Sequence, residues 1–205
     1  SAFPFRRGRC RGGESAALAH VAQYFSGTLA RDYKATRNGL TGIDCSSKLS
    51  PWLATGALSP RTVFAALQDH ESRHGVSDGS YWLWFELLWR DHFRLLHRKH
   101  GRRLYHGGGL GGQPPPAHHA GRFAAWAEGR TGQAFIDAAM RELATTGFLS
   151  NRMRQNVASY LIHDLGGDWR AGAAWFESQL VDHDICSNQG NWLYLAGRGT
   201  DPRGS

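Results

Sequence analysis

The 205-residue sequence has few cysteines and no long uncharged apolar run. Its three cysteines, Cys10, Cys45 and Cys186, lie far apart, and none belongs to a CxxC pair. A disulfide framework or a zinc site is therefore not expected, and this cysteine usage is typical of a reducing cytosol. No uncharged stretch approaches the ~18 residues of a membrane-spanning helix, and the first residues lack the apolar segment of a signal peptide. We therefore expect a cytoplasmic protein that makes no membrane contact.

Acidic residues are also in the minority. Asp and Glu number 17 against 24 Lys and Arg, which gives a formal net charge of +7, and 21 of the cations are arginines. Eight tryptophans accompany them. Because the arginine fork binds phosphates and aromatic rings stack on bases, this composition favours a nucleic acid or a planar cofactor that carries phosphates. A basic surface that is merely solvated explains the charge equally well.

Alternating patterns typical of strands are scarce, and most of the chain has helical periodicity. We expect helices over Glu14–Phe25, from the cap at Ser59-Pro60 onward, and over Tyr81–His100, Gly132–Thr145, Ser150–Leu165 and Trp169–Leu180. The first half of the third of these, YWLWFELLW, is apolar nearly all round and is expected to be buried on most sides. The sequence therefore predicts one all-α domain over residues 1–205. It has a basic, glycine-rich lead-in at 1–13 and a Gly/Pro-rich loop at 107–120 that separates two helical halves.

Two segments in the first half carry more polar chemistry than packing requires. One holds Ser46, Ser47, Lys48 and Ser50, whose hydroxyl and ammonium donors suit a phosphate, although serine-rich helix caps are common in any protein. The other is Glu86-Leu87-Leu88-Trp89-Arg90. Glu86 and Arg90 are i,i+4 neighbours, so they either form a structural ion pair or face a polar ligand.

Two further segments lie in the second half. Ser150–Asn156 places several polar groups at the start of an otherwise apolar helix, and Asp182–Trp192 holds two aspartates two residues apart. No third carboxylate has a suitable spacing, so we expect no metal site there.

Taken together and in this order, these segments resemble the FAD-binding helical domain of the photolyase/cryptochrome family, most closely its DASH branch. The resemblance extends from about Gly12 to Arg203. It is carried by YKATRNG, SSKLSPWLATGALSPR, YWLWFELLWRDHF, TGFLSNRMRQNVASYLIHDL, DWRAGAAWFESQL and SNQGNW.

The resemblance implies a set of cofactor-binding residues. Those matching the groups that hold the FAD phosphates and ribityl chain are Tyr33, Ser46, Ser47, Lys48, Leu49 and Ser50. Those matching groups around the flavin ring are Arg90, Arg154, Asp182, Asp184 and Asn188. Asp182 is expected to be the ion-pair partner of Arg154, and Asn188 matches the residue beside flavin N5.

The resemblance also implies substrate and electron-transfer residues. Glu86, Trp89 and Asn151 match groups that meet a DNA lesion, and Arg152 belongs to the same expected set. Trp192 and Trp169 match the first two members of an electron-transfer chain, although plain core packing is the usual role of a tryptophan.

The sequence departs from the family pattern at several places. Residues 114–118 contain no tryptophan where the third member of the chain is expected, so that Tyr105 or Trp126 is the candidate replacement. Gln189 and Cys45 stand where a tryptophan and a tyrosine are usual. The family's antenna domain and its stretch beyond the GTDPR segment are not in this sequence, so no antenna chromophore is expected, whether the chain is a natural short form or an excised piece.

The resemblance thus predicts a flavin-dependent enzyme that uses light to repair pyrimidine dimers. Its expected partner is single-stranded DNA. RNA stays open as an alternative nucleic acid. Two other functions stay open as well. One is a blue-light flavin photoreceptor without repair activity, and the other is a nucleic-acid-binding module that has lost FAD.

Overall fold

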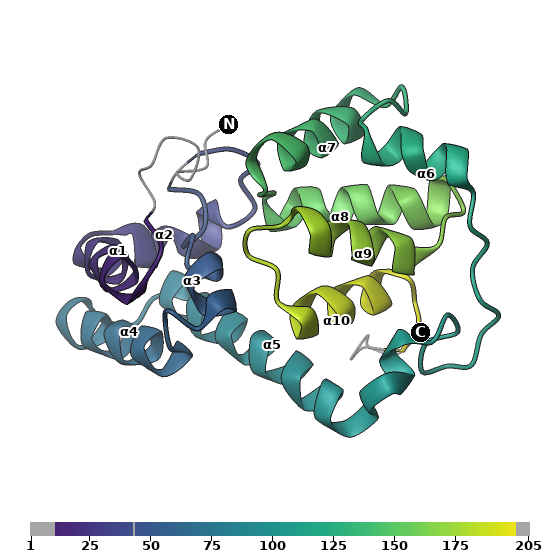
Figure 1. The fold of residues 1–205 in the computed structure, drawn as a ribbon. Helices are drawn as coiled ribbons and strands as arrows, with labels where there is room; N and C mark the ends of the chain where they lie inside the picture. Colours follow the sequence, from purple (N-terminus) through teal and green to yellow (C-terminus); the bar gives the residue numbers. More distant parts are fainter. Residues whose placement is uncertain (1–10, 43, 200–205) are drawn as a thin grey trace. The chain divides into compact units, whose positions relative to one another are not determined.

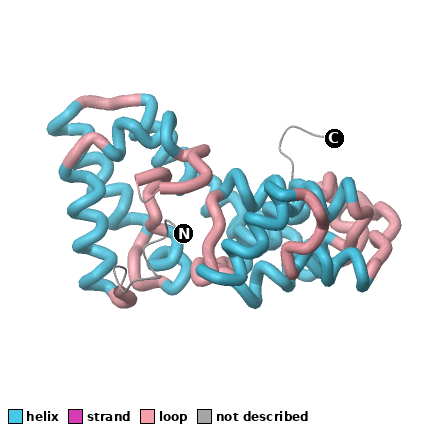
Figure 2. The backbone as a smooth tube through the Cα atoms, turned by 90° about the horizontal axis from the view of Figure 1, so that it is seen from above, coloured by secondary structure: helices cyan, strands magenta, loops and turns pink. Residues whose placement is uncertain are grey.

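The computed structural model describes residues 11–42 and 44–199, and no strand occurs among them (Figure 1, Figure 2). The all-α prediction is confirmed. Residues 1–10 of the expected lead-in, including Cys10, lie outside the described residues. In the described part, no helix is both long and apolar enough to cross a bilayer. The chain divides into two compact units, residues 1–90 and 91–205, each with its own core. A single domain over the whole chain stays a prediction.

The described residues of unit 1, which spans residues 1–90, form five helical segments. They are α1 (Glu14–Ser26), α2 (Leu29–Thr36), α3 (Ser50–Thr55), α4 (Pro60–His74) and the beginning of α5 (Asp78–His100). The expected cap of α4 is present, because Ser59 Oγ accepts a hydrogen bond from the backbone N–H of Arg61 at 3.2 Å and Pro60 follows. The core joins one face of α1 to α2 and α4 through Val21, Phe25, Tyr33 and Leu67.

The first half of α5 is less buried than its composition predicts. Leu83 is buried in the core of unit 1, whereas the side chains of Tyr81, Trp84 and Leu88 are 49%, 36% and 42% exposed. The helix therefore packs through one face rather than most of its sides, and the prediction of near-complete burial is wrong. A helix with apolar residues all round can still find a partner for only one face when its unit is small.

Unit 2, residues 91–205, holds the remaining helices. After the end of α5 come the 3₁₀ turn η2 (Gly101–Tyr105), α6 (Ala120–Ala127), α7 (Ala134–Thr146), α8 (Asn151–Ser159), the π turn η3 (Tyr160–Asp164), α9 (Trp169–Gln179) and α10 (Ile185–Leu195). The chain is irregular from residue 107 to the start of α6. Gly147 ends α7 as expected, with a left-handed φ of 69° and its N–H bonded to Leu143 O.

The core of unit 2 is rich in tryptophan. Trp126, Trp169 and Trp192 are each at most 2% exposed, and α8, α9 and α10 pack side by side around them (Figure 1). Close packing of α9 on α10 depends on Gly172, because a Cβ there would lie 2.2 Å from the Trp192 ring. These helices position the polar ends that form the pocket described below.

Candidate functional site

The predicted phosphate segment of unit 1 has an unusual backbone. Ser46 and Lys48 adopt positive φ angles of 70° and 56°, which side-chain-bearing residues rarely adopt. Leu49, which follows Lys48, is right-handed. A left-handed residue followed by a right-handed one turns successive N–H groups toward the same side and forms an anion-binding concavity. Backbone strain of this kind is concentrated at functional sites.

The side chains around this turn hold it in place. Lys48 is only 8% exposed, and its ammonium group donates to Cys45 O. His20 Nε2 lies 2.8 Å from Ser47 O, and the His20 ring packs on Trp52 at a centroid distance of 5.0 Å. Leu49 is 3% exposed and belongs to the core, so that the segment is anchored while Ser46, Ser47 and Ser50 remain partly accessible.

Tyr33 and Arg37 connect the phosphate segment to α5. Burial raises the pKa of Tyr33, the charge of Glu86 adds to this shift, and Arg37 and a hydrogen bond with Ser46 oppose it. The phenol therefore stays protonated at neutral pH. The Arg37 guanidinium lies over the Trp82 ring at 4.8 Å and over the Tyr33 ring at 5.9 Å.

Glu86 is the carboxylate at the end of this network. It forms an ion pair with Arg37, with 2.5 Å between Oε1 and Nη2. Burial raises the pKa of Glu86, and Arg37 only partly offsets it. The sequence reasoning placed Arg90 beside Glu86 and did not single out Arg37, although Arg37 lies in the quoted stretch YKATRNG. Trp89 and Arg90 are half-buried on the same helix.

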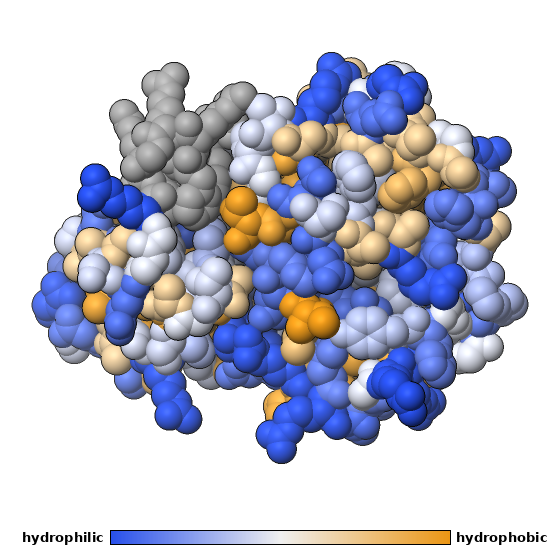
Figure 3. Space-filling view, in the orientation of Figure 1, coloured by the Kyte–Doolittle hydropathy of each residue, from blue (hydrophilic) through white to orange (hydrophobic). Residues whose placement is uncertain are grey.

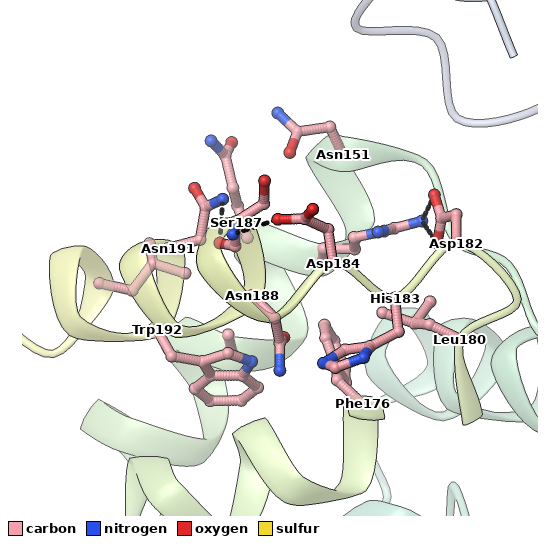
Figure 4. Close-up of a pocket in the computed structure, with 14 residues that line it drawn as sticks. Asn151, Phe176, Leu180, Asp182, His183, Asp184, Ser187, Asn188, Asn191 and Trp192 are labelled. Atoms are coloured by element: carbon pink, nitrogen blue, oxygen red, sulfur yellow. Dashed lines mark hydrogen bonds and ion pairs between the residues drawn. The ribbon is translucent and has the colours of Figure 1, made fainter. Parts of the chain in front are cut away.

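Unit 2 contains a pocket into which the predicted polar residues of α8 and α10 project (Figure 4). Two capped helix starts frame it. Ser150 Oγ accepts the N–H of Met153 at the start of α8, and Asp184 Oδ1 accepts the N–H of Ser187 at the start of α10. Predicted residues that line the pocket are Asn151, Arg154, Asp182, Asp184, Asn188 and Trp192.

Arg154 and Asp182 form the predicted ion pair. Nη2 of Arg154 lies 2.9 Å from each carboxylate oxygen of Asp182, whose side chain is 2% exposed. Nε of Arg154 donates to Leu149 O at 2.9 Å, and its guanidinium lies over the Phe148 ring. The pair fixes the chain between α9 and α10 against α8.

Asp184 has a second contact besides its cap. Its Oδ2 accepts from Arg94 Nη2 at 3.0 Å. Burial acts to raise the pKa of Asp184, but the hydrogen bonds from Ser187 and the charge of Arg94 outweigh it and hold the pKa below its ordinary value. Asp184 is therefore ionised at neutral pH.

Asn188, His183 and Trp192 shape the rest of the pocket. The Asn188 amide donates from Nδ2 to Ala173 O at 3.0 Å, and Trp192 is 2% exposed. His183 also lines the pocket, and its buried Nε2 has no hydrogen-bond partner among the described residues. The sequence reasoning missed His183 and Ser187, although both lie inside the Asp182–Trp192 segment that it singled out.

Two predicted residues of unit 2 do not line this pocket. Arg152 is exposed on α8, where it donates to Gln155. Trp169 is 1% exposed in the core, and its indole N–H donates to Gly107 O. The Trp192 ring instead meets Trp126 edge-on, with 6.3 Å between the ring centroids. Among the described residues, no group of three or more His, Cys, Asp or Glu side chains could hold a metal ion.

Comparison with known proteins relates both units to one family. A family model for the FAD binding domain of DNA photolyase matches residues 82–205. The chain is 54% identical to cryptochrome DASH of Danio rerio over 205 residues, which are 99% of this chain and 38% of that protein. It is 50% identical to the chloroplastic/mitochondrial cryptochrome DASH of Arabidopsis thaliana over 94% of this chain and 34% of that protein.

Solved structures agree. A cryptochrome of Synechocystis sp. superposes with a TM-score of 0.91 at 52% identity, over 95% of this chain and 41% of that one. A class III photolyase of Agrobacterium tumefaciens superposes with a TM-score of 0.82 at 34% identity, over 90% of this chain and 38% of that one. The chain therefore spans about two fifths of the length of these relatives.

Proposed function

Because the chain belongs to the photolyase/cryptochrome family, as part of its FAD-binding region, we propose that it binds FAD and repairs pyrimidine dimers in single-stranded DNA with light. The observation that carries this proposal is the pocket of unit 2, where Asp184, Asn188 and Trp192 lie together. A planar apolar ring beside an amide and a carboxylate is a suitable environment for the edge of a flavin ring.

Each unit, taken by itself, holds residues that suit a part of FAD. The backbone turn at Lys48 and Leu49, with the hydroxyls of Ser46, Ser47 and Ser50, suits a diphosphate. In the pocket of unit 2, the unpartnered His183 Nε2 is a buried polar atom that a bound ligand would satisfy. When bound in its reduced form, FAD would supply the light-driven one-electron transfer that splits the dimer.

Glu86, Trp89 and Asn151 are proposed to hold the lesion. Glu86, a carboxylate held by Arg37, is proposed to hydrogen-bond the edge of a base. The Trp89 indole stacks on a base. In unit 2, Asn151 is exposed at the rim of the pocket and matches a lesion-side amide of the family, and Arg152 is proposed to offer its cation to a phosphate.

The pocket residues of unit 2 are proposed to orient the flavin ring. The ionised Asp184 would accept a hydrogen bond from a ring N–H, and Asn188 would present a neutral amide to the ring. Asp182 and Leu149 O hold the guanidinium of Arg154 in place, so that this cation would lie beside the ring. Arg90, in unit 1, matches a flavin-side cation of the family.

Two measurements test the proposal. We expect the purified chain to show the visible absorbance of an oxidised flavin, and we expect its chemically reduced form to restore a dimer-containing single-stranded oligonucleotide under blue light but not in darkness. Trp89→Ala should weaken binding of the damaged strand by about 1–3 kcal/mol, while Trp84→Ala, an exposed indole on the same helix, should not.

The alternatives give different results. Flavin absorbance without repair of either a DNA or an RNA lesion would favour a photoreceptor, a function consistent with relatives that are named cryptochromes. A colourless protein that gains no flavin when FAD is added would favour a nucleic-acid-binding module. Either result would refute the repair proposal.

A further inference from the structure

A cluster of positively charged residues lies at the end of α5, and none of them has a role in the site described above. No aspartate or glutamate occurs from residue 92 to 127, whereas six Lys and Arg residues do. Four of them fall within six positions, and all four are exposed: Arg98, Lys99, Arg102 and Arg103. None of the four forms an ion pair with another described residue. We call these four side chains the basic turn, and the surface over the end of α5 is hydrophilic in Figure 3.

The charge exceeds what helix stability explains. A helix C-terminus carries about half an elementary negative charge, which one or two cations compensate. Here two cations end α5 and two more follow Gly101, whose left-handed φ of 53° starts the 3₁₀ turn η2. Burial lowers the pKa of His100, and the positive charges of Lys99 and Arg103 lower it further. Concentrated cations that repel one another favour an anionic partner.

An aromatic ring lies beside these cations. Tyr105 is 42% exposed, and its hydroxyl is 3.2 Å from Nε2 of His97 in the last turns of α5. The two rings also meet edge-on, with 5.9 Å between their centroids. Tyr105 is therefore fixed against the end of the helix that carries Arg98 and Lys99.

Buried contacts hold the basic turn in shape. Leu104, between Arg103 and Tyr105, is fully buried in the core of unit 2. Its carbonyl accepts a hydrogen bond of 2.6 Å from the buried amide of Gln189 on α10. Gln189 thus anchors η2 to α10. A rigid turn with outward cations and an exposed ring loses little conformational entropy when it binds.

We infer that the basic turn binds the phosphates of a single-stranded nucleic acid, with Tyr105 stacked on one of its bases. Clustered cations suit a chain of phosphates, and an exposed ring needs an unpaired base to stack on. A duplex offers the phosphates but keeps its base faces covered. This surface uses no residue proposed to bind the lesion or the flavin, although Tyr105 is also a candidate electron donor, so the inference extends the proposed function without depending on it.

The test uses undamaged strands and charge-matched variants. Binding of labelled oligothymidine and oligouridine to the 205-residue chain is followed by fluorescence anisotropy at several salt concentrations. Arg98→Gln/Arg102→Gln should weaken binding about 20-fold at 0.1 M salt and reduce the slope of log K against log salt by about 1.4. The control, Arg31→Gln/Arg61→Gln, removes the same charge from exposed positions of unit 1 and should change both values far less.

Tyr105 provides an independent readout. Tyr105→Ala should weaken binding of both single strands about 5-fold or more, and Tyr105→Phe should keep it. Equal losses with the two charge variants, or unchanged binding with Tyr105→Ala, would overturn the inference, as would a duplex that binds as tightly as a single strand. Comparison of the two oligonucleotides shows which nucleic acid the surface prefers. Because no lesion or light is involved, failure here is distinct from failure of repair.

Discussion

Glu86 is the residue whose ionisation is most clearly linked to folding. Burial holds its pKa above the ordinary value of 4.5, so the folded chain binds this proton more tightly than the unfolded chain does. Stability from this group is therefore present at low pH and is lost as the pH rises through the raised pKa. As the pH rises through this range, we expect the unfolding free energy of Glu86→Gln to increase relative to that of the wild type. Unfolding free energies from urea titrations between about pH 4 and pH 7 measure this difference.

Asp69 provides the control for this prediction. It is exposed on α4 and pairs with Arg73 at 2.6 Å. Asp69→Asn should leave the pH dependence in that window unchanged, because exposed pairs contribute little. Parallel stability curves for Glu86→Gln and the wild type would mean that Arg37 compensates the burial of Glu86 completely.

The serine hydroxyls test the phosphate segment. Ser47→Ala/Ser50→Ala should bind FAD about tenfold more weakly or worse, because each change removes a hydrogen bond of roughly 1 kcal/mol or more to a charged group. Flavin content after purification and titration with FAD both measure the loss. Ser72→Ala is the control, since that exposed hydroxyl on α4 donates only to Asp69 O. Wild-type flavin content in the double variant would contradict the assignment of this segment.

At the scale of elements, the helices were predictable wherever a local signal marks their ends. Ser59-Pro60 and Gly147 fixed the start of α4 and the end of α7 by capping chemistry. The exposure of Tyr81 and Trp84 on α5 was not predictable. The composition of a helix shows that its faces could be buried, but it does not show which faces have a neighbouring element to pack against. The positive φ angles of Ser46 and Lys48 were not predictable either, since neither residue type prefers that conformation.

Some contacts of the candidate site were likewise predictable from the sequence, and others were not. The Arg154–Asp182 pair was predicted from the resemblance and is present. Arg37 was missed because its partner Glu86 is 49 positions away and no spacing rule connects them. The two helix starts that hold Asn151 and Asp184 follow from local sequence, but their meeting in one pocket depends on how α8, α9 and α10 pack.

The tryptophans of α6, α9 and α10 carry the next prediction. Trp126 contacts the Trp192 ring but is itself fully buried, so it is an inner donor rather than a surface donor. With no tryptophan at 114–118 to continue the family's chain from Trp169, we expect slow photoreduction of bound flavin that depends on Trp126. Trp126→Phe should slow it severalfold under illumination with an external reductant. If Trp169→Phe alone slows it, Trp126 serves only packing.

At the scale of the whole molecule, the two cores raise the question of cooperativity. Leu67 belongs to the core of unit 1 and Leu161 to that of unit 2, and each is 1% exposed. α5 is a continuous helix of 23 residues that begins in one unit and ends in the other. Because breaking such a helix at the boundary would expose backbone and apolar surface in both units, the single domain predicted from the sequence should unfold in one step.

Core substitutions in each unit separate the two cases. Leu67→Ala and Leu161→Ala should each lower the unfolding free energy by about 2–5 kcal/mol. If the chain is one cooperative domain, both shift a single urea transition that circular dichroism and tryptophan fluorescence report at the same midpoint. Leu95→Ala, at a side chain that is 61% exposed, should leave the midpoint in place. Two transitions, with each core variant shifting only its own, would instead mean that the units fold independently and that α5 frays at their boundary.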